Sequence, residues 1–234
     1  MNGPALLALQ LIDSDTDHVE HRRRRLPEAA RHAEASAAVK ALQQRLAEAR
    51  QRGAEAEAAI ASAEQESAAL TTKRTRLEGQ LKTVISPREA EALMHEIELL
   101  TAKRGEQDDL ELAALDDAAA ADGEATALEA ELASAVAEAQ VTAAELATAQ
   151  RGLDGERQTL LASRPAAVAA LPADELATYE RMRAQFGGVA VAKLDGTRCQ
   201  GCHLDLSRGE VDAIRALPAD EAGECPQCNR LLVR

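Results

Sequence analysis

The chain has 234 residues, of which 46% are hydrophobic, 29% are charged and 1% are aromatic, and its formal net charge is −13. This acidity argues at first against nucleic acid as a partner, and one Phe, one Tyr and no Trp offer little to stack on unpaired bases or to line a haem pocket. No Gly-rich phosphate loop, nucleophile elbow or clustered acid–base pair is present, so we expect a protein that is not an enzyme.

The first predicted element is a helix from Ala5 to Arg25, and Pro27 is expected to bend its continuation. No basic residue precedes the leucines of this helix, and their apolar run soon meets Asp13 and Asp15. A secretory signal peptide has the opposite pattern, so we expect no signal peptide and a cytoplasmic protein.

Two long helices are predicted between residues 28 and 163, because small and apolar residues recur there in the alternating steps of four and three that mark a coiled-coil seam. Ser86 and Pro87 have the residue types of a helix start and separate the two helices. The first seam consists of Ala35, Val39, Leu42, Leu46, Ala49, Gly53, Ala56, Ile60, Ala63, Ser67, Leu70, Arg74, Leu77, Leu81 and Val84. The second consists of Leu93, Ile97, Leu100, the weaker positions Arg104, Gln107 and Glu111, and then Ala114, Ala118, Ala121, Ala125, Leu128, Leu132, Ala135, Ala139, Thr142, Leu146, Ala149 and Leu153.

The simplest arrangement of these helices is an antiparallel coiled-coil hairpin with its tip near residues 84–88 and arms of about 85 Å at 1.5 Å per residue. The same seams could instead pair between chains, because heptads do not identify the partner helix. We predict a mainly α fold, with the hairpin in residues 1–172 and a second domain in residues 173–234. Pro165 and Pro172 are expected to interrupt the helices between them, and Asp174 to Gln185 to form a shorter helix.

The second domain carries the four cysteines of the chain in two closely spaced pairs. Cys199 and Cys202 form the first C-x-x-C pair, Cys225 and Cys228 form the second, and 22 residues lie between the pairs. Two such pairs supply the four thiolates that tetrahedral Zn²⁺ prefers, so we predict one structural zinc ion in a small β zinc ribbon. Zinc binding would also supply folding energy that so small a core lacks.

Three other interpretations of the cysteines are weaker. Cys199 to His203 also spells the C-x-x-C-H attachment motif of a c-type haem, but that group requires export. A thiol-redox pair would be expected in a βαβ context, and structural disulfides would require an oxidising compartment. With zinc bound, His203 is expected to be a surface or packing residue, with a spare-ligand role as the alternative.

Secondary structure around the cysteines is predicted from short signals. Asp195-Gly196 after the apolar run 189–194 indicates a tight hairpin, and Ser207 with Glu210 indicates a capping box that begins a short helix before Pro218. A last strand is predicted at 231–233. Gly201 and Asn229 are expected to provide the relaxed backbone that metal knuckles need.

Charge is distributed unevenly along the chain. No Lys or Arg lies between Gly105 and Gln150, a stretch with twelve acidic residues. Two basic clusters are candidate contacts for nucleic acid or a protein partner, and the other interpretation is that they are solvated faces of a charged coiled coil. The cluster at the base contains Arg22, Arg23, Arg24 and Arg25, and the cluster at the tip contains Lys73, Arg74, Arg76, Lys82 and Arg88.

The chain resembles the bacterial family of coiled-coil hairpin proteins with a C-terminal four-cysteine zinc ribbon. The resemblance is carried by Leu6 to Gln10, Leu26-Pro27-Glu28, Arg88-Glu89, Glu96-Ile97, Tyr179-Glu180-Arg181, Gly187 to Val191, Cys199 to His203, Ile214-Arg215 and Cys225 to Cys228. It implies zinc on the four cysteines and a role without catalysis, and some members are linked to an alternative sigma factor, to flagellar or secretion regulation and to RNA binding. Asn229 departs from the family, which usually has glycine after the last cysteine, and the acidic stalk departs from the basic surfaces of RNA-binding members.

Three functional hypotheses follow. The first is an adaptor that docks on a protein partner in transcription or nucleic-acid-associated regulation. The second is direct binding of RNA or DNA through the basic tip and base. The third is an enzyme, a thiol oxidoreductase or a hydrolase that uses the ribbon, and it is the weakest because four thiolates leave no open position on zinc. No membrane or small-molecule substrate is expected.

Overall fold

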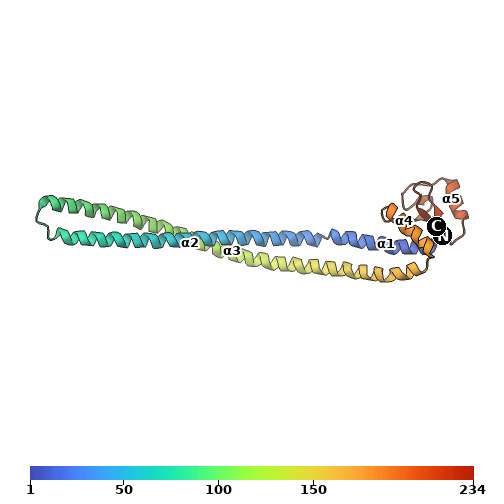
Figure 1. Ribbon diagram of the computed structural model, residues 1–234, viewed down its shortest axis with the longest axis horizontal. Coiled ribbons are helices and arrows are strands. Elements are labelled where there is room, and N and C mark those ends of the chain that lie inside the picture. Colours follow the sequence, from blue (N-terminus) through green and yellow to red (C-terminus); the bar gives the residue numbers. More distant parts are fainter. The chain divides into compact units, whose positions relative to one another are not determined.

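The computed structural model describes residues 1–234, which form a long helical hairpin and a small C-terminal sheet (Figure 1). The chain divides into two compact units, of which the first contains residues 1–30 and 143–234 and the second contains residues 31–142. The boundary expected at residue 172 lies inside the first unit. None of the helices combines the length and the apolar character needed to span a lipid bilayer. The elements are α1 (Gly3–Arg24), α2 (Pro27–Leu81), α3 (Pro87–Ala169), α4 (Ala173–Gln185), β1 (Val191–Asp195), β2 (Arg198–Cys199), α5 (Arg208–Ala216), β3 (Gly223–Glu224) and β4 (Leu231–Val233).

In the second unit, α2 and α3 run antiparallel and pair with each other within one chain (Figure 1). All positions of the two predicted seams are buried or half-buried, including the weak positions 104, 107 and 111. The best-packed layers contain Leu46 and Ala49 from α2 and Ala125 and Leu128 from α3. The predicted coiled-coil hairpin is therefore confirmed, and its seam is closed by the chain's own second arm.

The helix ends agree with the sequence signals at most positions. α2 ends at Leu81 and α3 begins at Pro87, so the predicted tip near 84–88 is confirmed. Pro27 is the first residue of α2, where its missing N–H has no helical partner to lose, and α1 ends before it.

The predicted break at Pro165 is wrong, because α3 continues through it to Ala169. Tertiary contacts on both sides of the proline account for this difference. The preceding residue, Arg164, forms an ion pair with Asp13, and the following Ala167 and Val168 pack against the core of the first unit.

The core of the first unit is formed by α1, α4, the segment at the start of β1, and β4. Leu6 and Leu9 of α1, Tyr179 of α4 and Ala190 before β1 are fully buried, and Leu231 and Val233 of β4 pack with them. Both chain ends lie in this unit (Figure 1).

The small sheet has the strand order β2-β1-β4-β3. The predicted hairpin is formed by β1 and β2, with Gly196 at φ 62° in the turn, and the predicted last strand is β4. β4 pairs parallel to β1 and antiparallel to β3. The predicted capping box is present at the start of α5, where the Ser207 and Glu210 side chains each bond the other residue's backbone N–H. A second core of Leu194, Leu206, Val211, Ile214 and Leu232 lies beside the cysteines.

Candidate metal centre and its supporting contacts

The four cysteines converge on one point. The Sγ atoms of Cys199, Cys202, Cys225 and Cys228 all lie within 4.8 Å of one another, and none is in a disulfide. Sulfur ligands about 2.3 Å from a tetrahedral zinc ion are about 3.8 Å apart, so the donor set matches this ion in number, type and spacing. The first cysteine of each pair is fully buried and the second is half-buried.

The two cysteine pairs sit in loops with the same backbone hydrogen bonds. The N–H of His203 donates to the Cys199 carbonyl, and the N–H of Asn229 donates to the Cys225 carbonyl, both at 2.8 Å. His203 has φ 61° and Asn229 has φ 59°, so each loop turns through a left-handed residue directly after its second cysteine. The expectation for Asn229 is confirmed, and the two cysteine loops have the same backbone conformation.

The expectation for Gly201 is wrong in its reason, because this residue does not have positive φ and His203 takes the left-handed position. Gly201 is instead in close contact with its neighbours. A Cβ at this position would lie 2.9 Å from both the Cβ of Ala192 and the Cδ of Arg230. Only hydrogen fits there, so glycine allows the first knuckle to pack against β1 and Arg230.

The thiols differ in their tendency to ionise. Burial raises the pKa of Cys225 to about 12, and it also raises the pKa of Cys202. Burial opposes ionisation of Cys228 as well, but hydrogen bonds from the backbone and side chain of Arg230 lower the pKa of that thiol to about 7. Of these three thiols, Cys228 ionises most readily because Arg230 donates to its sulfur.

Arg230 also connects this centre to the segment before β1. Its guanidinium donates to the carbonyl oxygens of Val189 at 2.8 Å and Phe186 at 3.2 Å, and it lies 5.0 Å from the centroid of the Phe186 ring. His203 is exposed and is not part of the cluster of metal-ligand groups. The cluster contains only the four sulfur donors.

Gln10 of α1 attaches the helical part of the first unit to the sheet. Its buried side-chain oxygen accepts hydrogen bonds from the N–H groups of Ala190 at 2.7 Å and Val191 at 3.1 Å, and its amide nitrogen donates to the Gly188 carbonyl at 2.8 Å. The backbone that leads into β1 is thus held by one side chain of α1.

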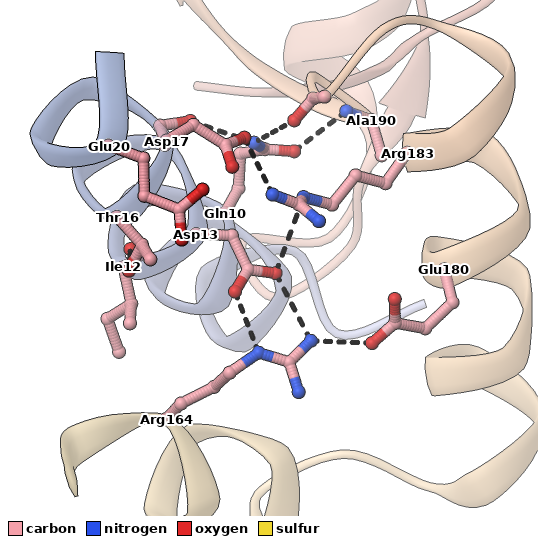
Figure 2. Close-up of polar contacts among 12 residues, drawn as sticks. Gln10, Ile12, Asp13, Thr16, Asp17, Glu20, Arg164, Glu180, Arg183 and Ala190 are labelled. Atoms are coloured by element: carbon pink, nitrogen blue, oxygen red, sulfur yellow. Dashed lines mark hydrogen bonds and ion pairs between the residues drawn. The ribbon is translucent and has the colours of Figure 1, made fainter. Parts of the chain in front are cut away.

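A charged network surrounds Asp13, the buried acid of α1 (Figure 2). Arg164 of α3 donates to its carboxylate through Nε at 2.7 Å and through a second nitrogen at 3.3 Å, and the Tyr179 hydroxyl of α4 donates at 2.8 Å. The Nε atom of Arg183 lies 3.6 Å from the same carboxylate, and its terminal nitrogen donates to Asp17 at 2.6 Å. Three helices therefore meet at one carboxylate.

The pKa shifts follow from this geometry. Burial disfavours the Asp13 carboxylate, but the hydrogen bonds from Arg164 and Tyr179 and the charges of Arg164 and Arg183 outweigh it and lower the pKa of Asp13. Burial and the hydrogen bond to Asp13 raise the pKa of the Tyr179 phenol. The network is ionised at Asp13 and neutral at Tyr179 around neutral pH.

The supporting roles of Gln10 and Asp13 were not predicted from the sequence. A signal was present, because Leu6, Leu9, Gln10 and Asp13 occupy one face of a helix. Two polar side chains on an otherwise apolar, buried face must find hydrogen-bond partners.

The arginines of the predicted base cluster largely pair within the chain. Arg22 forms an ion pair with Glu156, and Arg23 forms one with Asp154 at 2.8 Å. Arg24 and Arg25 are exposed. Arg151 and Arg157 of α3 were expected near this cluster, but together they do not make a strong basic patch. Glu156 and Asp154 lie beside the arginines, and Arg157 itself pairs with Glu20 at 3.1 Å.

The tip cluster is less basic than its own segment suggests. Lys73, Arg76, Lys82 and Arg88 are exposed and form no ion pair, and Arg74 pairs with Glu78 at 3.2 Å. The antiparallel partner arm, however, brings four further acids to the same end of the hairpin, and these are Glu89, Glu91, Glu96 and Glu98. The prediction of a basic tip counted only the charges of residues 71–88 and left out the glutamates that α3 brings to the same end.

Comparison with known proteins agrees with this architecture. Rv2229c of Mycobacterium tuberculosis is 27% identical over 238 residues, which cover 98% of this chain and 94% of that protein. A structure from Mycobacterium smegmatis superposes with a TM-score of 0.85 at 24% identity and covers 100% of this chain and 97% of its own. The structure of CT398 from Chlamydia trachomatis superposes with a TM-score of 0.81 at 20% identity and covers 98% and 96%.

A family model described as the CT398-like coiled coil hairpin domain matches residues 9–187. This range includes most of α1, all of α2 and α3, and α4. The chain therefore belongs to the family of proteins with a CT398-like coiled coil hairpin domain.

Proposed function

We propose that the four cysteines bind one structural Zn²⁺ ion and that the protein is a non-enzymatic adaptor, which docks on a protein partner in transcription or nucleic-acid-associated regulation. The observation that supports this proposal is the convergence of four thiols from two matching knuckles. Bound zinc would supply a cross-link between the β1–β2 hairpin and the segment before β4. Four thiolates fill its coordination sphere, so this centre has a structural rather than a catalytic role.

Metal analysis of protein purified without added zinc tests the first part. We expect one zinc per chain in the wild type and loss of zinc in Cys225→Ser. His203→Ala is the matched control, because the imidazole lies in the same knuckle but outside the cluster, and it should keep the full metal content. Retention of one zinc by Cys225→Ser would contradict four-thiolate binding.

Replacement by Co²⁺ adds a readout of the ligand set. A tetrahedral thiolate site gives strong charge-transfer and visible absorption bands, which the wild type and His203→Ala should share. A change of the cobalt spectrum in His203→Ala would show that the imidazole enters the site and would revive the spare-ligand interpretation.

The adaptor role needs a partner that recognises the folded protein. Immobilised zinc-loaded protein should retain a defined protein partner from a bacterial extract, and the metal-free Cys225→Ser variant should lose it if the ribbon contributes to docking. Failure to retain any protein with zinc in place would count against the adaptor.

Direct nucleic-acid binding is the second candidate, and the four unpaired cations at the tip favour it. The four glutamates of the opposite arm oppose it. Binding of RNA or DNA should weaken steeply with salt and should be lost when Lys73, Arg76, Lys82 and Arg88 are neutralised together. Unchanged binding in that variant would eliminate the tip as a nucleic-acid site.

A further inference from the structure

One segment of the hairpin carries acids and no cations on both arms. Residues 53–72 of α2 and 105–121 of α3 lie opposite each other, as the pair of Gly53 with Ala121 and the 3.1 Å hydrogen bond of Ser67 with Asp108 show. Neither range contains Lys or Arg. We call this segment the acidic band, and its ten acids are Glu55, Glu57, Glu64, Glu66, Glu106, Asp108, Asp109, Glu111, Asp116 and Asp117.

The acidic band also exposes large apolar side chains. Leu110, Leu112 and Leu115 are 58%, 62% and 45% exposed, although the seam of α3 at this level uses positions 107, 111 and 114. These leucines do not hold the hairpin together. Leu112 and Leu115 lie about 60° apart around α3, and Leu110 lies on the other flank of the seam. Exposed leucines among carboxylates are solvated poorly by water and are typical of a protein contact.

The tip of the hairpin combines an exposed apolar side chain with positive charge, which complements the acidic band. Ile85 is 96% exposed at the turn, and a shallow groove of about 400 Å³ lies beside it, lined by Val84, Ala92 and Leu93 with three polar residues. Lys73, Arg76, Lys82 and Arg88 surround this end of the hairpin and form no ion pair.

The acidic band and the tip are on the same unit, separated by a fixed length of helix. Lys73 lies about 18 Å from the turn, and from Ile85 to Ala121, the far end of the acidic band, the distance along α3 is about 54 Å at 1.5 Å per residue. Two copies that overlap antiparallel by this length bring each tip onto the other copy's acidic band. Because both contacts form together, the arrangement closes on itself as a two-fold dimer.

The contact area is adequate for a stable dimer. A strip about 54 Å long and about 20 Å wide, which is the width of two helices, covers about 1,100 Å² on each copy. Standard protein interfaces bury about 800 Å² per partner, so this strip is large enough. Anionic partners such as nucleic acid or an acidic membrane would be repelled by ten carboxylates, whereas the tip of a second copy supplies the opposite charge.

We propose that the protein self-associates as an antiparallel dimer in which the tip of each hairpin, with Ile85 and its four unpaired cations, docks on the acidic band of the other. This surface is separate from the cysteine centre and does not depend on the proposed function. Zinc content and docking of other partners can therefore succeed or fail independently of it.

Sedimentation equilibrium of the full, zinc-loaded chain tests the proposal. We expect a dimer at low salt that dissociates as salt rises from about 0.02 M to about 0.5 M, because the Debye length falls below 10 Å. Ile85→Asp should weaken the dimer at least tenfold, since an apolar anchor is replaced by a charge that the acidic band repels. Ile85 is almost fully exposed, so this substitution leaves the fold intact, and Val141→Asp, at a 53% exposed position of α3 outside both surfaces, is the control.

A charge exchange provides the decisive measurement. One variant carries Asp109→Lys, Asp116→Lys and Asp117→Lys, and the other carries Lys73→Glu, Arg76→Glu and Lys82→Glu. Each alone should be monomeric, because both of its tip contacts join like charges. Their equimolar mixture should form a heterodimer, because both contacts then join opposite charges. A wild type that stays monomeric at about 100 μM and low salt, or a mixture that stays monomeric, would overturn the proposal.

Discussion

The network around Asp13 gives the most specific stability prediction. Asp13 is 4% exposed, and Arg164 and Tyr179 direct three hydrogen bonds to its carboxylate. Asp13→Ala leaves the Tyr179 hydroxyl buried without a partner and the Arg164 charge without its closest acid. Removing one partner of a buried ion pair costs about 3–5 kcal/mol. With a urea m-value of about 2 kcal/mol/M, the unfolding midpoint of the first unit should fall by about 2 M.

The chain contains one tyrosine, so the signal can be assigned to this unit. Near-ultraviolet circular dichroism of Tyr179 follows the first unit during urea unfolding, with zinc kept saturating. Asp15→Ala is the matched control, because Asp15 is an exposed acid on the same helix and its loss should change the free energy of unfolding by less than about 0.5 kcal/mol. Equal midpoints for the two variants would refute the structural role of the carboxylate.

The same carboxylate makes stability depend on pH in a defined direction. Its pKa is lowered in the folded protein, so its stabilising contribution is complete above the unfolded pKa of about 3.9 and is lost as pH falls through the lower folded value. The difference in unfolding free energy between wild type and Asp13→Asn should therefore be constant near neutral pH and shrink in acid. A difference that grows on acidification would contradict the assignment.

Three further outcomes are expected. His203→Gly should stabilise the zinc-loaded first unit by about 0.5–1 kcal/mol in thermal unfolding, because glycine adopts positive φ without strain, and Asn229→Gly should do so by less; destabilisation by both would contradict the knuckle geometry. Leu128→Ala should cost about 2–4 kcal/mol in unfolding followed at 222 nm, whereas Leu112→Ala should cost almost nothing, since the two leucines are 2% and 62% exposed. Gln10→Ala should accelerate hydrogen exchange of the two backbone amides that Gln10 binds at β1, and unchanged protection there would show that its side chain is dispensable.

The sequence was sufficient to predict the hairpin because its signal is periodic. Steps of four and three identified each seam residue, and a chain with two such seams joined by a proline-containing tip has a simple way to bury both. Cysteine spacing predicted the thiol cluster for a similar reason, since each C-x-x-C loop places two sulfurs close together and two such pairs supply the four thiolates that zinc prefers. Both signals are local repeats that need no knowledge of long-range contacts.

The supporting contacts depend on pairs of residues far apart in the sequence. Asp13 and Arg164 are 151 positions apart, and Gln10 and Ala190 are 180 positions apart. No periodicity connects such residues. A polar residue on an apolar face therefore indicates that the side chain is buried, but it does not identify the residue that it bonds. Pro165 shows the same limit, because the contacts that keep α3 helical beyond it come from α1 and the core of the first unit.

The N-terminal residues bond directly to the last part of the chain. The N–H of Gly3 donates to the Asp220 carbonyl at 2.7 Å, and the N–H of Ala222 donates to the Met1 carbonyl at 3.1 Å. During synthesis residues 1–9 leave the ribosome long before residues 171–233 are made. Leu6 and Leu9 of α1 therefore stay exposed to water until these later core residues have emerged. The hairpin between them holds its own local contacts and can fold early, whereas the first unit closes last, as the slow, non-local step of folding.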